Sequence, residues 1–321
     1  MKRLLSAAVI LFCTLIVTSA SAIPIIPELT SEGFLPSGVE PYVYASRMEG
    51  RWVYVSDELY VNIIRYKSTE PKAEMVWFET EIKCTGETRL TPLFARPDKP
   101  IESTLRIPKD IADSYGVVLA FTDDFYGNRW LTHATEGIII RNGKILFKKT
   151  RRNNSKSFPP LEILALFQDG SLKTFKSKEH TAQEYLDMGV TDTFAFGPIL
   201  VQNGQLGERM SNPHYFHYRE PRCALGMVEP NHYYVLTVIG RQKESRGAYF
   251  SWLAERMIEL GVQEALNLDG GSTASLYFMG DVINIPENRK KKNIRRVTSM
   301  IGIGTASNAE DQSTTGQSEG K

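Results

Sequence analysis

The segment 264–277 contains the residues best suited to chemistry. Its apolar run ends in an acid, Asp269, and two glycines and a run of small side chains over 272–275 follow directly. A buried strand that ends in a carboxylate, followed by main chain without bulky side chains, presents a fixed acid beside accessible amide groups. We therefore predict that this segment forms the floor of an active site. The alternative is a tight turn after a buried strand.

Charged side chains also stand where other apolar runs end. Asp123 and Asp124 follow the run 117–121, and Arg241 comes shortly after the run 232–238. Charges at strand ends are well placed to meet a ligand, although a structural ion-pair network would use the same residue types.

Periodicity and composition predict the elements that position these residues. Runs rich in β-branched and aromatic side chains predict strands over 52–55, 59–66, 75–82, 117–121, 193–201, 232–238, 265–269 and 297–304. Asn142-Gly143 and Asp169-Gly170 predict the turns of two hairpins. Helices are predicted over 108–115, after a capping box that starts at Thr181, and over 249–260. The last helix stands between two strands, which predicts an α+β fold with a mixed β-sheet core and packed helices.

The N-terminus predicts export. Lys2 and Arg3 precede an apolar run over 4–17 and an Ala-Ser-Ala pattern at 20–22, so we expect a signal peptide over 1–22, with a retained N-terminal anchor as the alternative. The remaining segments are an extended lead-in (23–50), one domain (51–304) and a disordered polar tail (305–321). The expected location is therefore secreted or in the cell envelope, with no membrane span after cleavage.

Charge and cysteine content limit the partners. The chain has 38 basic and 37 acidic residues, which gives no overall case for nucleic acid or membrane surfaces as partners. Cys84 and Cys223 either form a disulfide or are core residues. The histidines show no zinc-ligand spacing, so we predict no metal or cofactor; calcium is the alternative, although no loop of ligands is recognisable.

Several motifs, taken in order, resemble the phosphodiester glycosidase family, whose bacterial members are exported envelope proteins. The resemblance spans 75–304, and its matching stretches are 124–127, 136–144, 196–204, 221–227, 240–241 and 267–280, with Arg296 and Ser299 in a further basic motif. It implies a phosphodiester-glycosidase-like domain. It also implies an enzyme that hydrolyses the bond between the anomeric carbon of a sugar and a phosphodiester.

The resemblance and the residue types together assign roles. Asp269 and Asp124 are the candidate catalytic carboxylates, which stabilise an oxocarbenium ion or activate water. Arg222 and Arg241 suit a phosphate because a guanidinium is a planar, forked donor. The remaining substrate-binding candidates are the amides of Gly270, Gly271, Ser272 and Thr273, together with Asn267 and Arg296; Asp123, Asn203 and Tyr126 are further candidates.

Two positions depart from the family pattern in a way that bears on activity. Ile239 and Met300 stand where family members have acids. Two functions therefore remain open. One is an exported glycosidase that acts on a phosphoglycan or an envelope polymer such as an exopolysaccharide, and the other is a catalytically impaired envelope protein that binds such a polymer. The basic cluster 289–296 is either a solvated loop or a patch for a polyanionic glycan. The sequence identifies no protein partner.

Overall fold

The computed structural model describes residues 25–68, 74–98, 100, 104–124, 137–149, 161–211, 218–285 and 295–305. The predicted signal peptide, Tyr126, the basic residues 289–292 and positions 306–321 of the predicted tail lie outside these ranges. In the described part of the chain, no helix is both long enough and apolar enough to span a membrane.

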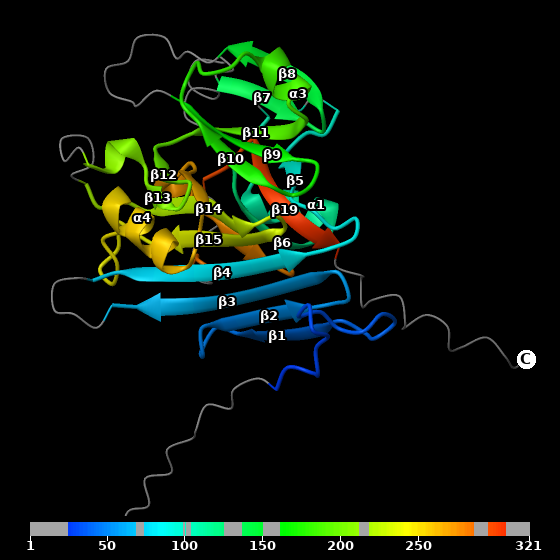
Figure 1. Cartoon of the computed structure of the whole chain (residues 1–321). Coiled ribbons are helices and arrows are strands. Elements are labelled where there is room, and N and C mark those ends of the chain that lie inside the picture. Colours follow the sequence, from blue (N-terminus) through cyan, green and yellow to red (C-terminus); the bar gives the residue numbers. More distant parts are fainter. Residues whose placement is uncertain are drawn as a thin grey trace, which may run out of the picture.

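Among the described residues, the largest sheet has nine strands and runs across the lower half of the molecule (Figure 1). In spatial order, these strands are β1 (Tyr42–Ser46), β2 (Arg51–Val55), β3 (Leu59–Lys67), β4 (Val76–Cys84), β15 (His232–Val238), β14 (Arg222–Glu229), β16 (Glu264–Asn267), β12 (Ile199–Gln202) and β13 (Gln205–Leu206). Strand β1 lies within the predicted lead-in and pairs with β2, so the sheet begins before residue 51.

A second sheet packs against the first. Its strands, in spatial order, are β18 (Asp281–Val282), β17 (Leu276–Phe278), β6 (Val117–Thr122), β19 (Ser299–Thr305) and β5 (Thr91–Phe94). The main hydrophobic core lies between the two sheets and joins, for example, Phe78 and Val235 of the first sheet to Phe121 and Ile301 of the second. This core brings the ends of β6 and β16 together, although they are far apart in sequence.

Helices cover the outer faces of the two sheets. Helix α4 (Phe250–Glu259) packs on the nine-stranded sheet, and α1 (Pro108–Tyr115) packs on the other. Strand β15 shows the resulting pattern, because Val235 lies in the shared core and Leu236 lies beneath α4. Both faces of this strand are therefore buried, which is in keeping with its nearly continuous apolar run. The bounds of both helices confirm the predictions from their capping residues.

A smaller lobe lies at the top of Figure 1. It consists of a three-stranded sheet, a hairpin and a short helix, which are β10 (Leu172–Phe175), β9 (Glu162–Phe167), β11 (Val190–Phe196), β7 (Gly137–Arg141), β8 (Lys144–Lys149) and α3 (Ala182–Asp187). Both predicted hairpins form here, and Thr181 and Glu184 make the predicted capping box. Two short 3-10 turns complete the described elements, over Glu208–Ser211 and Gly271–Thr273.

The prediction of a mixed sheet is wrong. Every strand pair of the described chain is antiparallel, and helices are few. Helix α4 does connect two strands that run in the same direction, β15 and β16, but β14 lies between them and pairs with each in the antiparallel sense. The predicted strand 193–201 is also divided, because Gly197 has a φ of 105° and turns the chain from β11 into β12.

Both cysteines of the described chain are free and buried in the shared core. The predicted alternative of a disulfide is therefore wrong, and the alternative of core residues is confirmed. Burial raises the pKa of Cys84 and of Cys223 to about 12.

We expect that neither thiol reacts with iodoacetamide in the folded protein at pH 8, because only a small fraction is ionised and the sulfurs are inaccessible. Both should react fully after denaturation in urea. Peptide mass spectrometry after timed labelling checks this. Alkylation of either thiol in the native protein at the rate of a free cysteine would contradict the assignment.

Candidate active site

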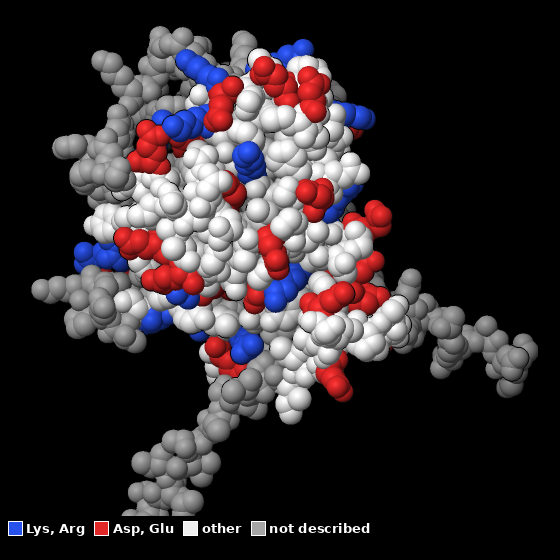
Figure 2. Space-filling view, in the orientation of Figure 1, with Lys and Arg blue, Asp and Glu red and all other residues white. Residues whose placement is uncertain are grey.

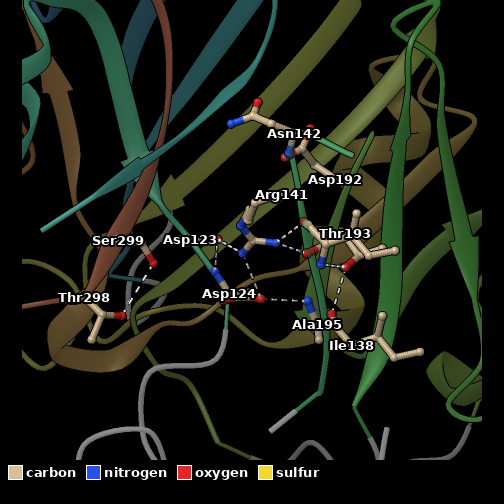
Figure 3. Close-up of polar contacts among 11 residues, drawn as sticks. Asp123, Asp124, Ile138, Arg141, Asn142, Asp192, Thr193, Ala195, Thr298 and Ser299 are labelled. Atoms are coloured by element: carbon tan, nitrogen blue, oxygen red, sulfur yellow. Dashed lines mark hydrogen bonds and ion pairs between the residues drawn. The ribbon is translucent and has the colours of Figure 1, made fainter. Parts of the chain in front are cut away.

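Two buried carboxylates follow strand β6 directly. Asp123 and Asp124 are each 3% exposed, and the amide nitrogen of Asp124 donates to Asp123 Oδ1 at 2.6 Å. The amide nitrogen of Ala195 donates to Asp124 Oδ2 at 3.1 Å, which ties the acid to strand β11 (Figure 3). Strands from two sheets therefore fix the position of this pair.

Arg141, at the end of β7, holds both acids. Its Nη2 lies 3.5 Å from Asp123 Oδ1 and 3.3 Å from Asp124 Oδ2, and Nη1 donates to the carbonyl oxygens of Ile140 and Thr193 (Figure 3). The guanidinium is fully buried, which alone would lower its pKa, but the neighbouring aspartates raise the pKa above its usual value. Arg141 therefore stays charged inside the protein.

Arg141 is not among the residues that the sequence predicted for the site. It follows the apolar run Ile138–Ile140 and so shows the same strand-end pattern that singled out the aspartates. It also directly precedes the Asn142-Gly143 turn, and a charged residue beside a hairpin turn is usually solvated.

Asp269 meets the two acids from the opposite sheet. Strand β16 ends at Asn267, and the amide nitrogen of Asp269 donates to the carbonyl oxygen of Asp123 at 3.2 Å. The three aspartates line one cavity, which we call the acid cavity; its other lining residues are Pro108, Thr122, Thr273, Ser275, Val297, Thr298, Ser299 and Met300. The cavity volume of about 10 Å³ leaves room for about one water molecule. The structure thus brings Asp124 and Asp269 together, as the sequence predicted.

The segment 270–275 forms one wall of this cavity and is fixed by Thr122. The Thr122 hydroxyl accepts from the amide of Ser275 at 2.8 Å and donates to the carbonyl oxygen of Thr273 at 3.1 Å. The predicted anion nest is wrong. The amide of Gly270 donates to the Asp269 side chain, that of Gly271 to Pro221 and that of Thr273 to Gly270, which leaves at most the Ser272 amide for a ligand.

A second cavity borders the same segment, and we call it the arginine cavity. Gly271, Ser272 and Ala274 line it together with Arg241 and Arg295, and its volume is about 150 Å³. Because Thr273 and Ser275 line the acid cavity instead, the segment 270–275 forms a wall between the two cavities. The expected carboxylates and Arg241 are therefore neighbours in two adjoining cavities, not in one cleft.

Arg241 is held at the mouth of the arginine cavity. Its side chain is 56% exposed, and Nε donates to Glu220 Oε2 at 2.6 Å. A Cβ atom at Gly271 would lie 3.4 Å from Arg241 Nη2, and the φ of Gly271 is 62°. A glycine at this position therefore permits both the turn and the close approach of the guanidinium.

Comparison with known proteins decides the family. The family model for phosphodiester glycosidases matches residues 115–304, more than half of the chain. The chain belongs to the phosphodiester glycosidase family.

Solved structures share the fold of this family member. The catalytic domain of zebrafish N-acetylglucosamine-1-phosphodiester alpha-N-acetylglucosaminidase, auto-inhibited by its pro-peptide, matches with a TM-score of 0.61 and 18% identity over 83% of this chain and 88% of that one. A hypothetical protein from Synechocystis matches with a TM-score of 0.51 and 14% identity over 77% of this chain and 62% of that one.

A curated relative matches part of the chain. The SPβ prophage-derived uncharacterized protein YomE of Bacillus subtilis (strain 168) is 26% identical over 149 residues, which is 46% of this chain. The matched region covers 22% of the length of YomE.

In this family member, Arg222 lines neither cavity. Its guanidinium lies over the ring of Phe250, 3.8 Å from the ring centroid, and donates to the carbonyl oxygens of Ala248 and Tyr218. Burial lowers the pKa of Arg222 to about 10. The predicted contact between Arg222 and a phosphate is wrong. A planar guanidinium stacks well on an aromatic ring, and Arg222 stacks on the Phe250 ring of α4 instead.

The remaining predicted residues have different positions. Asn267 is buried and donates to the carbonyl oxygens of Gly197 and Leu268, so it joins β16 to the start of β12 and lines neither cavity. Asn203 lies in the turn after β12, where its amide donates to Glu264 at the opposite end of β16 from Asp269. Arg296 is exposed, and its neighbour Arg295 lines the arginine cavity instead.

The two departures from the family pattern fall one in each cavity. Met300 is 1% exposed and lines the acid cavity, and Ile239 lines the arginine cavity. Asp123 adds a carboxylate to the cavity that contains Met300. In the described ranges, no group of three histidine, cysteine or acidic side chains is arranged to hold a metal ion.

Proposed function

We propose that the protein is an exported phosphodiester glycosidase that cleaves the bond between a sugar anomeric carbon and a phosphodiester in a glycan or an envelope polymer. Membership of the family supports this reaction class. The observation that carries the proposal is the meeting of Asp123, Asp124 and Asp269 in one cavity that adjoins a second, arginine-lined cavity.

The acid cavity suits attack by water at an anomeric carbon. It has room for about one water molecule next to three carboxylates. Asp123 and Asp124 are engaged by Arg141, whereas Asp269 is the least buried of the three. We assign Asp269 as the base or nucleophile, and Asp123 and Asp124 as charges that stabilise an oxocarbenium-like transition state.

Asp123 also supplies a carboxylate in the cavity where a family acid is missing. Met300 stands in the acid cavity at the position of that acid, and the Asp123 carboxylate lies in the same cavity. We assign to Asp123 part of the negative charge that the missing acid would supply. The replacement at 300 is thus compatible with hydrolysis.

The arginine cavity suits the phosphate. Arg241 and Arg295 line it without an acid in the same lining, and small side chains separate it from the acid cavity. A substrate bound in the arginine cavity would place its phosphate at the guanidinium groups and its anomeric carbon against the wall 270–275, across which the aspartates lie. The departing phosphate monoester has a second pKa of about 6, so it needs little protonation to leave.

The test is direct. Purified protein should release free sugar and methyl phosphate from the methyl phosphodiester of N-acetylglucosamine 1-phosphate, while the methyl glycoside of the same sugar stays intact. Product analysis by chromatography and mass spectrometry checks both substrates. An absence of sugar release from the diester and from its glucose counterpart, with the protein folded, would overturn the proposal.

We expect Arg241→Gln to raise KM for the diester about tenfold or more, because a hydrogen bond to a charged group contributes about 1.5–3 kcal/mol. The side chain is exposed, so its loss should leave the unfolding temperature nearly unchanged. Arg246→Gln is the matched control, since Arg246 is also exposed and paired with a glutamate, Glu74, and lines neither cavity. An equal KM for both variants would remove Arg241 from phosphate binding.

A further inference from the structure

The arginine cavity continues into a larger one. An outer cavity of about 410 Å³ shares four lining residues with it, namely Ile239, Gln242, Asn284 and Ile285. The outer cavity reaches β3, where Arg65, Tyr66 and Lys67 line it. The two cavities therefore form one groove, which leads away from the wall 270–275 toward β3.

The outer cavity has an excess of positive charge. Its basic lining residues are Arg47, Arg65 and Lys67, and its acidic one is Glu244. Arg47 is occupied, because its Nε donates to Asp281 at 2.8 Å. Arg65 and Lys67 are exposed, and the described residues provide no ion-pair partner for either. These two cations are thus available to an anionic ligand.

The apolar surface of the groove does not come from the ring of Tyr66, because successive side chains of a strand point to opposite faces of the sheet. Tyr66 stacks on Trp77 with a centroid distance of 5.3 Å, and Trp77 contacts Trp252 of α4 edge-on, so these rings lie on the face that α4 covers. Arg65 and Lys67 point to the groove instead. There, Ile239 and Ile285 provide partly exposed apolar surface along which a polyol can lie, while the two cations attract phosphate.

The positive charge of the groove is a local feature and does not reflect the charge of the whole chain. The chain has a net charge of +1, and Figure 2 shows acidic and basic side chains interspersed over the face in view. A small diester would fill the arginine cavity alone, so the cations of the outer cavity have no role in cleaving it. They would, however, meet the next phosphates of a longer substrate.

We infer that this groove binds the aglycone side of an extended phosphoglycan, a chain in which phosphodiesters alternate with sugars or polyols. The inference rests on the proposed function, because it identifies the substrate class of the same site. Phosphates beyond the scissile bond lie at Arg65 and Lys67, and the intervening polyol lies along Ile239 and Ile285. The substrate is a polymer, not a small sugar phosphate.

Binding of fluorescently labelled poly(glycerol phosphate), about eight units long, tests the inference without any turnover. We expect the double variant Arg65→Gln/Lys67→Gln to weaken binding about three- to tenfold, as measured by fluorescence anisotropy at low salt, because each exposed charge contributes modestly. The control Arg89→Gln/Lys173→Gln removes the same charge from exposed positions that line neither cavity, and it should bind like the wild type.

The outcomes separate the two proposals. The inference that the groove binds the polymer would be overturned by equal affinity of the wild type and the Arg65/Lys67 variant. An equal loss of affinity in both double variants would overturn it too. Binding that depends on Arg65 and Lys67, without hydrolysis of any sugar phosphodiester, would support the groove and overturn the proposed function. Hydrolysis of the methyl diester by a protein that does not bind the polymer would support the proposed function and overturn the inference about the groove.

Discussion

Replacing Asp269 with asparagine should lower the rate of sugar release from the methyl phosphodiester by about 10²- to 10⁴-fold, the contribution typical of a positioned general base. The change removes the charge and keeps the shape. Asparagine can still accept the hydrogen bond that Gly270 donates to Asp269 Oδ1 at 2.8 Å. The wall 270–275 should therefore keep its conformation, and the loss should appear in kcat more than in KM.

Initial rates of sugar release, measured with wild-type and variant protein of equal unfolding temperature, check this expectation. Asp169→Asn is a matched control, because Asp169 also accepts a backbone amide, that of Ser171 at 2.9 Å, but lies in a hairpin turn outside both cavities. It should keep full activity. A rate for Asp269→Asn within about threefold of the wild type would remove Asp269 from the chemistry.

The elements that the sequence predicts well are those whose signals are local. Asn142-Gly143 and Asp169-Gly170 specify hairpin turns through their own backbone preferences, and both hairpins form. Helix α1 begins at a proline and is followed by Gly116 in the left-handed conformation, so its two ends are encoded within a few residues. Such features need no knowledge of the rest of the fold.

Strand pairing depends on residues that are far apart in sequence, and here the prediction of which strands are neighbours is wrong. Helix α4 between two strands suggested neighbouring parallel strands, but β14 lies between β15 and β16. Nothing in the segment 232–269 shows that an earlier strand occupies this place. The mixed sheet was therefore predicted where an antiparallel one forms.

The candidate site shows the same limit at the level of side chains. Acids at strand ends could be predicted, because a buried strand fixes where its last residue lies. The direction in which an arginine side chain points could not be predicted. Arg222 turns to the ring of Phe250, whereas Arg141 turns inward to Asp123 and Asp124. Each partner is distant in sequence, so only the tertiary structure decides which guanidinium reaches the site.

Arg141→Met should lower the free energy of unfolding by about 3–5 kcal/mol at pH 7, the cost typical of breaking a buried ion pair. Methionine fills a similar volume but leaves two carboxylates, each 3% exposed, without their cation. It also removes the donors to the carbonyl oxygens of Ile140 and Thr193. Lys109→Met is the control: its exposed pair with Asp113 should contribute at most about 1 kcal/mol.

Urea denaturation at pH 7 and at pH 5 checks both the size and the cause of this effect. If uncompensated charge destabilises Arg141→Met, protonation of the carboxylates relieves it, so the deficit relative to the wild type should shrink as the pH falls. A deficit from lost packing would not depend on pH. Adding Asp124→Asn to Arg141→Met should likewise recover part of the stability, because it removes one of the two stranded charges. Stability of Arg141→Met equal to that of Lys109→Met would show that the buried carboxylates do not need Arg141, and would leave the acid cavity without its organising cation.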